Sequence, residues 1–126
     1  MRIDFQALGL ESVEGGAARA RLQELACSNA VQVREQLLIL LNRGARDVIV
    51  DLTDCAVVCE CCGVPALIRA NRRARALGAR LGIAVPEESP TRQALERASR
   101  SEPFPLTIVP VAPVGPPPVK APLAAA

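Results

Sequence analysis

Hydrophobic and polar residues alternate along some stretches of the chain and recur with helical spacing along others. Residues 17–25, AARARLQEL, alternate apolar and polar positions, which predicts a strand with one polar face. DVIVDL at 47–52 and RLGIAV at 80–85 are short apolar runs between turn signals, a pattern typical of strands covered on both faces. LTIVPV at 106–111 predicts a last strand at the edge of the sheet, where Pro110 is tolerated.

Helical spacing of apolar residues predicts three helices between and after these strands. The first is expected to begin at Ser28 or Asn29, which both offer a side-chain oxygen as N-cap, and to stop at Gly44. The second has Pro65 in its first turn, where the missing N–H costs nothing, and ends at Gly78. The third opens on a Ser-Pro cap and covers about residues 89–99.

The order of these elements predicts an α/β fold. We expect a single domain whose mainly parallel central sheet has about four to five strands, with helices packed on it. This domain is expected to cover residues 1–111. Most of the 11 prolines occur from Pro103 onward, and residues 112–126 have few groups that could bury a core, so they are expected to form a flexible proline-rich tail.

Composition narrows the range of functions. Half of the residues are apolar but only 2% are aromatic, so the core is expected to be aliphatic and no stacking platform for single-stranded nucleic acid is expected. The formal net charge of +2 provides no electrostatic reason for binding nucleic acid. Because histidine is absent, the commonest general base and metal ligand are missing. We therefore expect a non-enzymatic protein without a cofactor.

The apolar runs and the N-terminal stretch predict where in the cell the protein is located. No apolar run is long enough to predict insertion into a membrane. Asp4 and Glu11 interrupt the stretch in which a signal peptide needs continuous apolar residues. We therefore expect a cytoplasmic protein whose 5 cysteines are free thiols.

Two segments taken together resemble a known family. VREQLLILLNRGARDVIVDLTDCAVV at 33–58 and GVPALIRANRRARALGARLGIAV at 63–85 resemble a STAS domain of the bacterial anti-sigma factor antagonist type. Such proteins typically carry a leucine-rich helix, a V-D-L strand, a D-S-S-G-L loop and a helix rich in Ala and Arg, in this order. The similarity covers about residues 17–100. It implies a STAS-like fold and a partner that is an anti-sigma factor or a related kinase-like regulatory protein.

The D-S-S-G-L motif of that family corresponds to ECCGV at residues 60–64. In the family, the first serine of the motif is phosphorylated by the partner, and Cys61 stands in its place here. A thiol is not a substrate for ordinary seryl phosphorylation, so the resemblance implies that this switch is missing. The family's G-E-L-D segment, whose acid lies near the phosphorylation site, corresponds to residues 23–26, which end in Ala26.

Three interpretations of the cysteines in this loop are open. A bound metal is not expected, because Cys59, Cys61, Cys62 and the nearby Cys55 lie so close in sequence that they would have to fold back on themselves at a strand-to-helix turn. A redox site is a candidate, because Cys59 and Cys62 form a C-x-x-C motif where a helix N-terminus would favour a thiolate. We favour simple replacement, in which the nearly isosteric cysteine keeps the turn but loses the phosphate acceptor.

The resulting hypothesis is a protein-interaction module that binds its partner through this loop and the helix after it. The predicted partner-binding residues are Glu60, Cys61, Cys62, Gly63, Val64, Arg69 and Arg72. The arginines lie opposite the apolar stripe of their helix, and would meet an acidic partner surface. Two alternatives are an accessory subunit of a phospholipid ABC-type transport assembly and a thiol-based redox sensor that uses Cys59, Cys61 and Cys62.

Overall fold

The computed structural model describes residues 10–14 and 17–111. The strands are β1 (Leu10–Glu14), β2 (Ala17–Arg21), β3 (Glu24–Leu25), β4 (Asp47–Asp51), β5 (Val57–Val58), β6 (Arg80–Pro86) and β7 (Thr107–Val111). The helices are α1 (Ala30–Asn42), α2 (Gly63–Ala76) and α3 (Pro90–Ser99). The predicted tail at 112–126 lies outside the described residues.

Five strands form the main sheet, in the order β1-β2-β4-β6-β7. β1 and β2 are antiparallel, and every other neighbouring pair in this sheet is parallel. A second sheet consists of β3 and β5, which are also parallel. The predicted α/β fold with a mainly parallel sheet is confirmed, and β7 is the predicted edge strand.

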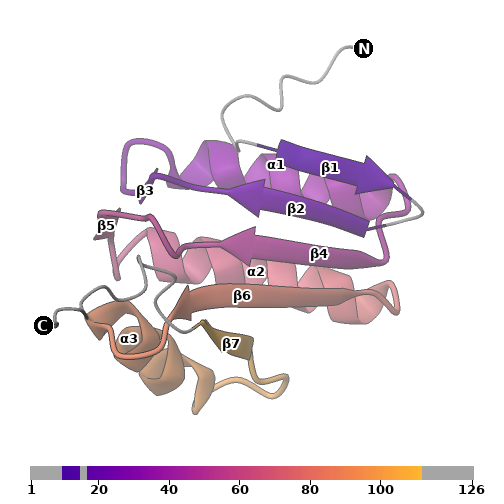
Figure 1. The fold of residues 1–126 in the computed structure, drawn as a ribbon. Helices are drawn as coiled ribbons and strands as arrows, with labels where there is room; N and C mark the ends of the chain where they lie inside the picture. The colour runs from indigo at the N-terminus through magenta and orange to yellow at the C-terminus, as the bar shows by residue number, and fades with distance from the viewer. Residues whose placement is uncertain (1–9, 15–16, 112–126) are drawn as a thin grey trace, which may run out of the picture.

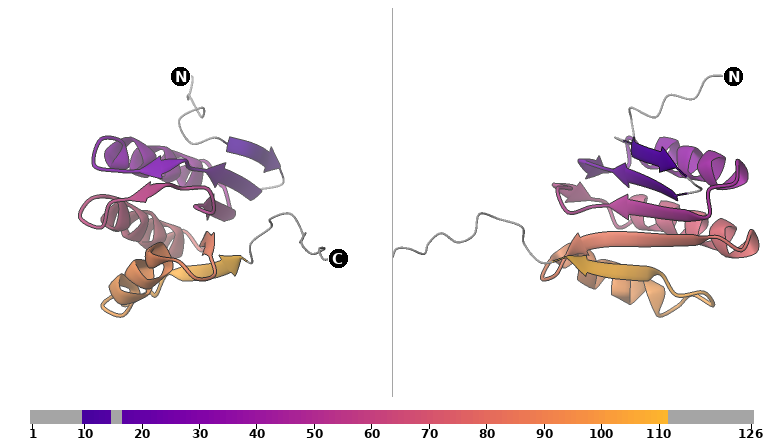
Figure 2. Two further views of the ribbon diagram at one scale, coloured as in Figure 1. Left: turned by 60° about the vertical axis from the view of Figure 1, so that its left-hand side comes forward. Right: turned by 45° about the vertical axis from the view of Figure 1, so that its right-hand side comes forward.

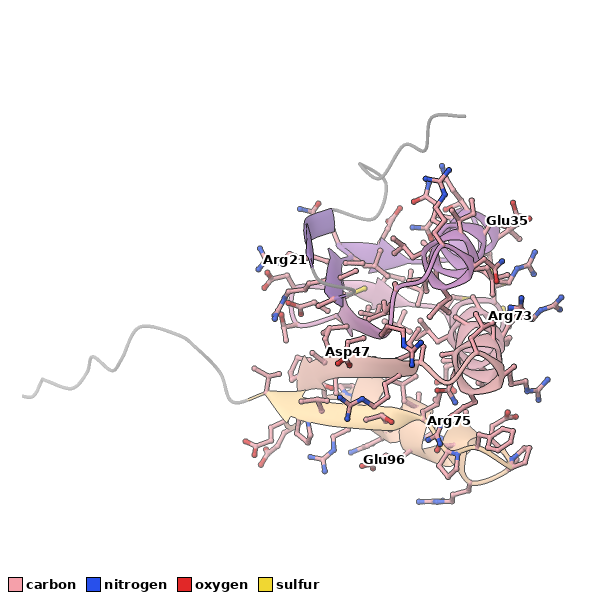
Figure 3. All side chains as sticks on the ribbon, turned by 90° about the vertical axis from the view of Figure 1, so that its right-hand side faces the viewer. Arg21, Glu35, Asp47, Arg73, Arg75 and Glu96 are labelled. Atoms are coloured by element: carbon pink, nitrogen blue, oxygen red, sulfur yellow. The ribbon has the colours of Figure 1, made fainter. Side chains whose placement is uncertain are left out.

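All three helices cover the same face of the main sheet (Figures 1 and 2). The core between the two layers is aliphatic, as the composition predicts. Its largest fully buried side chains are Leu22, Leu25, Leu37, Leu52, Leu67, Leu81, Ile83, Leu95, Val33, Val48 and Val50. Charged side chains extend outward from both layers: Glu35 and Arg73 lie on the helical side, and Arg21 on the opposite side (Figure 3).

Within the described residues no helix covers the other face of the sheet, and the prediction that the strand at 47–52 is covered on both faces is wrong, whereas residues 81–85 of β6 are buried on both faces, as predicted. In β4, Val48 and Val50 are fully buried against the helices, whereas Ile49 on the other face is only half-buried. On β6, this face is covered by a side chain of the neighbouring strand and not by a helix. The residue opposite Ile49 is Gly82, and the Ile49 side chain covers it on the open face.

Asp51 is a buried carboxylate at the end of β4, with 1% of its surface exposed. One carboxylate oxygen accepts hydrogen bonds from the Thr53 N–H at 2.9 Å and the Thr53 hydroxyl at 2.6 Å. The other oxygen lies 2.6 Å from the guanidinium of Arg19 on β2. Burial raises the pKa of Asp51, but the Thr53 and Arg19 hydrogen bonds outweigh it and hold this pKa below its usual value.

Asp51→Asn tests how much this carboxylate stabilises the sheet. We expect the free energy of unfolding at pH 7 to fall by about 1–3 kcal/mol, since buried hydrogen bonds to a charged acceptor are weakened. The Arg19 side chain is 46% exposed, so solvent screens its contribution. The matched control is Asp47→Asn on the same strand, whose ion pair with Arg80 is largely exposed, and whose loss should cost less than about 0.5 kcal/mol.

The effect of Asp51 should also depend on pH. Its folded-state pKa is lowered, so its stabilising effect is present above the unfolded-state pKa of about 3.9 and is lost as the pH falls through the folded-state pKa. Urea unfolding of the parent and of Asp51→Asn, from neutral pH to strongly acidic pH, measures both effects. Equal stability of the two proteins at neutral pH would contradict this role.

Candidate functional site

Two loops meet at one end of the domain because β3 pairs with β5. The pairing places Glu24 opposite Val57 and Leu25 opposite Val58. Beyond it, the N–H of Cys59 donates to the Leu25 carbonyl at 2.7 Å. The loop that leads from β3 into α1 therefore lies beside the loop that leads from β5 into α2, at the end of the domain where β3 and β5 are labelled in Figure 1.

Gly63, the first residue of α2, allows these loops to approach closely. A Cβ atom at this position would lie 2.8 Å from Cγ and 3.0 Å from the carbonyl oxygen of Leu25, closer than side-chain atoms can pack. The N–H groups of Gly63 and Val64 donate to the Cys59 carbonyl at 2.7 and 3.2 Å, which turns the chain sharply into the helix. The glycine of the ECCGV motif is thus required by packing.

Asn29 fixes the other loop. Sequence analysis predicts it as a side-chain cap of α1, and this is wrong: it occupies the N-cap position but makes no side-chain cap hydrogen bond. Its side-chain oxygen accepts from the N–H of Ala26 at 2.7 Å, and its amide nitrogen donates to the Glu24 carbonyl at 3.0 Å. The side chain therefore stabilises the turn that carries Cys27.

Four cysteine sulfurs converge where the loops meet. Cys27 comes from the β3–α1 loop, and Cys59, Cys61 and Cys62 come from the β5–α2 loop. The Sγ of Cys27 lies 2.7 Å from that of Cys62, 3.1 Å from that of Cys59 and 3.5 Å from that of Cys61. All of these cysteines are free thiols, and their sulfurs lie within 4.8 Å of one another. We refer to these residues as the thiol cluster.

Cys55, which the sequence analysis groups with the loop cysteines, lies outside the thiol cluster. It is half-buried, and its thiol donates to the Val57 carbonyl at 3.2 Å. Burial raises the pKa of this thiol. Cys55 is therefore a packing residue, and it serves as an internal control for the other thiols.

Within the thiol cluster, Cys59 is the acidic member. Hydrogen bonds from Cys61 and Cys27, together with those from the N–H groups of Cys62 and Cys61, lower the pKa of Cys59 to about 6. Hydrogen bonds with Cys62 and Cys59 raise the pKa of Cys27 to about 11, and hydrogen bonds with Cys59 and Cys27 raise the pKa of Cys61. The acidic thiol is therefore Cys59, whose pKa is lowered mainly by the neighbouring thiols, whereas the pKa of Cys61 is raised.

The predicted partner-binding residues divide into an exposed and a buried group. Glu60, Cys61, Arg69 and Arg72 are exposed, and Cys62 is half-buried at the N-cap of α2. Gly63 and Val64 are buried and therefore shape the loop rather than present a surface.

Neighbouring ion pairs engage two of the exposed residues. Glu60 pairs with Arg97 of α3 at 3.2 Å. Arg72 donates twice to Glu102, each time at 3.0 Å. Arg69 has no ion-pair partner within residues 17–111, so it is the more available of the two predicted arginines.

An open groove of about 490 Å³ runs between the first turns of α1 and α2, beside the thiol cluster. Cys27 and Cys62 form part of its wall, with the apolar side chains of Val31 and Ile68 and the guanidinium of Arg69. Val31 is 58% exposed, although it is a large apolar residue. The groove combines apolar area and positive charge next to the loop that the sequence singles out.

Cys27 is the site residue that the sequence analysis missed. The resemblance already places residues 23–26 near the loop that corresponds to the phosphorylation site, and Cys27 is the next residue. This position next to residues 23–26 was the sequence feature that could have predicted Cys27 as a site residue. Spacing alone could not reveal it, because one helix and two strands separate Cys27 from Cys59 in the sequence.

Comparison with known proteins agrees with the architecture. No protein-family model matches the chain, and no curated protein sequence matches it. The solved structure of the anti-sigma factor antagonist SpoIIAA in its unphosphorylated form superimposes with a TM-score of 0.61 and 20% sequence identity, and covers 81% of this chain and 86% of that chain. No helix in the described residues is long and apolar enough to cross a membrane.

The low pKa of Cys59 predicts the order in which the thiols react. In reduced, chelator-treated protein, iodoacetamide should modify Cys59 first, with a rate that rises around pH 6, because the thiolate is the nucleophile. Cys55 should react slowly. Peptide mass spectrometry across pH measures the order. Cys59→Ser should remove the fast reaction and Cys55→Ser should retain it, and equal labelling rates at Cys55 and Cys59 would contradict the assignment.

The sheet order, the helices on one face and the superposition lead to one conclusion about architecture. The chain has a STAS-like fold, the fold of the anti-sigma factor antagonist SpoIIAA.

Proposed function

We propose that this protein is a non-enzymatic interaction module of the anti-sigma factor antagonist type, which binds an anti-sigma factor or a related kinase-like regulatory protein in the cytoplasm. The observation that carries the proposal is the SpoIIAA-like fold, with the loop at 59–63 opening α2 beside an exposed groove. The sequence resemblance of residues 33–58 and 63–85 to the same class supports it independently of the coordinates.

The proposed binding surface combines the exposed part of the loop with the adjoining face of α2. Glu60, Cys61 and Cys62 supply the loop, and Arg69 and Arg72 supply the helix. Arg72 is already bound to Glu102, so Arg69 is the cation best placed to meet an acidic partner surface. The apolar wall of the groove supplies area that a partner can bury.

Loss of the phosphate acceptor is the second part of the proposal. Residues 59–64, CECCGV, contain no hydroxyl side chain, and Cys61 stands where the family carries its phosphorylated serine. A phosphate would add about −1.5 to −2 charges at the start of α2. Without that modification, binding to the partner is constitutive or is controlled in another way.

The phosphorylation part is tested by incubating the full chain with a kinase-type anti-sigma factor and ATP. We expect no phosphate on residues 59–64, because a thiol replaces the acceptor hydroxyl. Intact mass followed by peptide mapping makes the measurement. Cys61→Ser is the informative variant, and is expected to restore at most weak phosphorylation, because Ala26 stands where the family's G-E-L-D segment has its final acid. A stoichiometric phosphate on this loop in the parent protein would contradict the replacement.

The binding part is tested by Arg69→Glu. Titration calorimetry against each purified anti-sigma factor of the source organism should identify a partner that the parent binds, and Arg69→Glu should bind it at least about tenfold more weakly, with a strong dependence on salt. The matched control is Arg46→Glu, which reverses an exposed arginine in the turn between α1 and β4, at the other end of the domain. Equal losses for both variants, or no binding by the parent to any of these factors, would contradict the proposal.

A further inference from the structure

The thiol cluster has a geometry that the proposed function does not explain. Its sulfurs come from two chain segments that are separated in sequence by α1, β4 and β5. A tetrahedral metal site is commonly built in this way, with two segments converging on one ion. The cysteines from 55 to 62 alone would have to fold back on themselves to bind a metal, which made a metal unexpected. Cys27, which comes from another segment, replaces Cys55 as the fourth thiol and removes this obstacle.

We propose that Cys27, Cys59, Cys61 and Cys62 bind a single Zn²⁺ ion in a tetrahedral four-thiolate site. A Zn–S bond is about 2.3 Å long, so the sulfurs of such a site lie about 3.8 Å apart. The sulfur separations in the cluster run from 2.7 to 3.7 Å for five of its pairs. Cys27 and Cys61 are exposed, so small rotations of their side chains can open the cluster to the size of the ion.

The ligand set selects the type of ion. All four donors are sulfur, and soft thiolates favour Zn²⁺ over Mg²⁺ and Ca²⁺, which bind through oxygen. Each thiol that binds the ion as a thiolate releases its proton to solvent. Four protein ligands leave no open coordination position, so the ion would hold the structure together rather than activate water.

The surroundings of the cluster suit the charge of the loaded site. One Zn²⁺ with four thiolates carries a net charge of about −2. The groove that Cys27 and Cys62 help to form is lined by the guanidinium groups of Arg34, Arg69 and Arg72 and by the carboxylate of Glu102. Arg72 is paired with Glu102 and Arg34 with Glu35, so Arg69 is the cation best placed to offset part of this charge.

The site is assembled by contacts that do not involve the thiols. The Asn29 side chain holds the turn that carries Cys27, and the contact between Leu25 and Gly63 holds the two loops together. The ion therefore finds its ligands largely preorganised. It would fasten the start of α1 to the start of α2, which is the wall of the groove. This inference does not rest on the proposed function, because it concerns the ligands alone.

The test uses the reduced, metal-free full chain titrated with Co²⁺ and then with Zn²⁺. We expect one Co²⁺ per chain, with the intense visible bands and near-ultraviolet sulfur charge-transfer bands of a tetrahedral thiolate complex, and displacement of the colour by Zn²⁺. Zn²⁺ should also raise the thermal midpoint by more than about 5 °C, because it binds the folded state. The increase in midpoint is a readout that needs no partner.

Three variants make the test specific. Cys27→Ser should weaken binding at least about tenfold and remove the four-thiolate spectrum. Cys61→Ser, also at an exposed position, should do the same from the other loop. Cys55→Ser should bind like the parent. Far-ultraviolet circular dichroism confirms that each variant is folded.

Three results would contradict the proposed zinc site. One is substoichiometric binding of Co²⁺ and Zn²⁺ by the parent. Another is equal weakening by Cys55→Ser and Cys27→Ser. The third is a Cys27–Cys62 disulfide in protein purified without reductant, shown by non-reducing peptide mapping, since that bond would assign the cluster to thiol redox chemistry.

Discussion

The arrangement of the site depends on one close contact, that between Leu25 and Gly63. There is no space for a side chain at Gly63, and the hydrogen bond from Cys59 to the Leu25 carbonyl runs beside this contact. Together they bring the loop before α1 within reach of the loop before α2. The thiol cluster and the groove wall both follow from that approach, because each combines residues from both loops.

This contact also links the two proposals without making one depend on the other. A partner protein would bind the exposed loop and the arginine face of α2, whereas an ion would bind the cysteine sulfurs, of which those of Cys61 and Cys62 belong to the same loop. A metal ion bound to the thiol cluster would restrict the motion of the loop, and this would lower the entropy cost of binding a partner. In this view the cysteines replace a switch based on phosphate charge with a loop whose shape is fixed by a metal.

Local patterns in the sequence predict most of the fold. Alternation in β2, the apolar runs of β4 and β6 and the Ser89 cap of α3 depend on neighbouring residues, and each is confirmed.

The open face of the sheet was not predictable, because Ile49 and Gly82 lie on different strands and their contact depends on register. The role of Asn29 was also hidden, since its partners Glu24 and Ala26 offer only backbone groups. Cys27 escaped for a related reason: β3 and β5 are two residues long, too short for a periodic pattern to predict their pairing.

The most direct test of the account is X-ray absorption at the zinc edge on the full chain, purified under reducing conditions and loaded with one equivalent of Zn²⁺. Convergence of Cys27 with the three cysteines of the β5–α2 loop predicts a first shell of four sulfur atoms at about 2.3 Å. In Cys27→Ser the same measurement should show three sulfurs and a lighter oxygen scatterer. A parent spectrum dominated by oxygen or nitrogen, or one that Cys27→Ser leaves unchanged, would contradict the account.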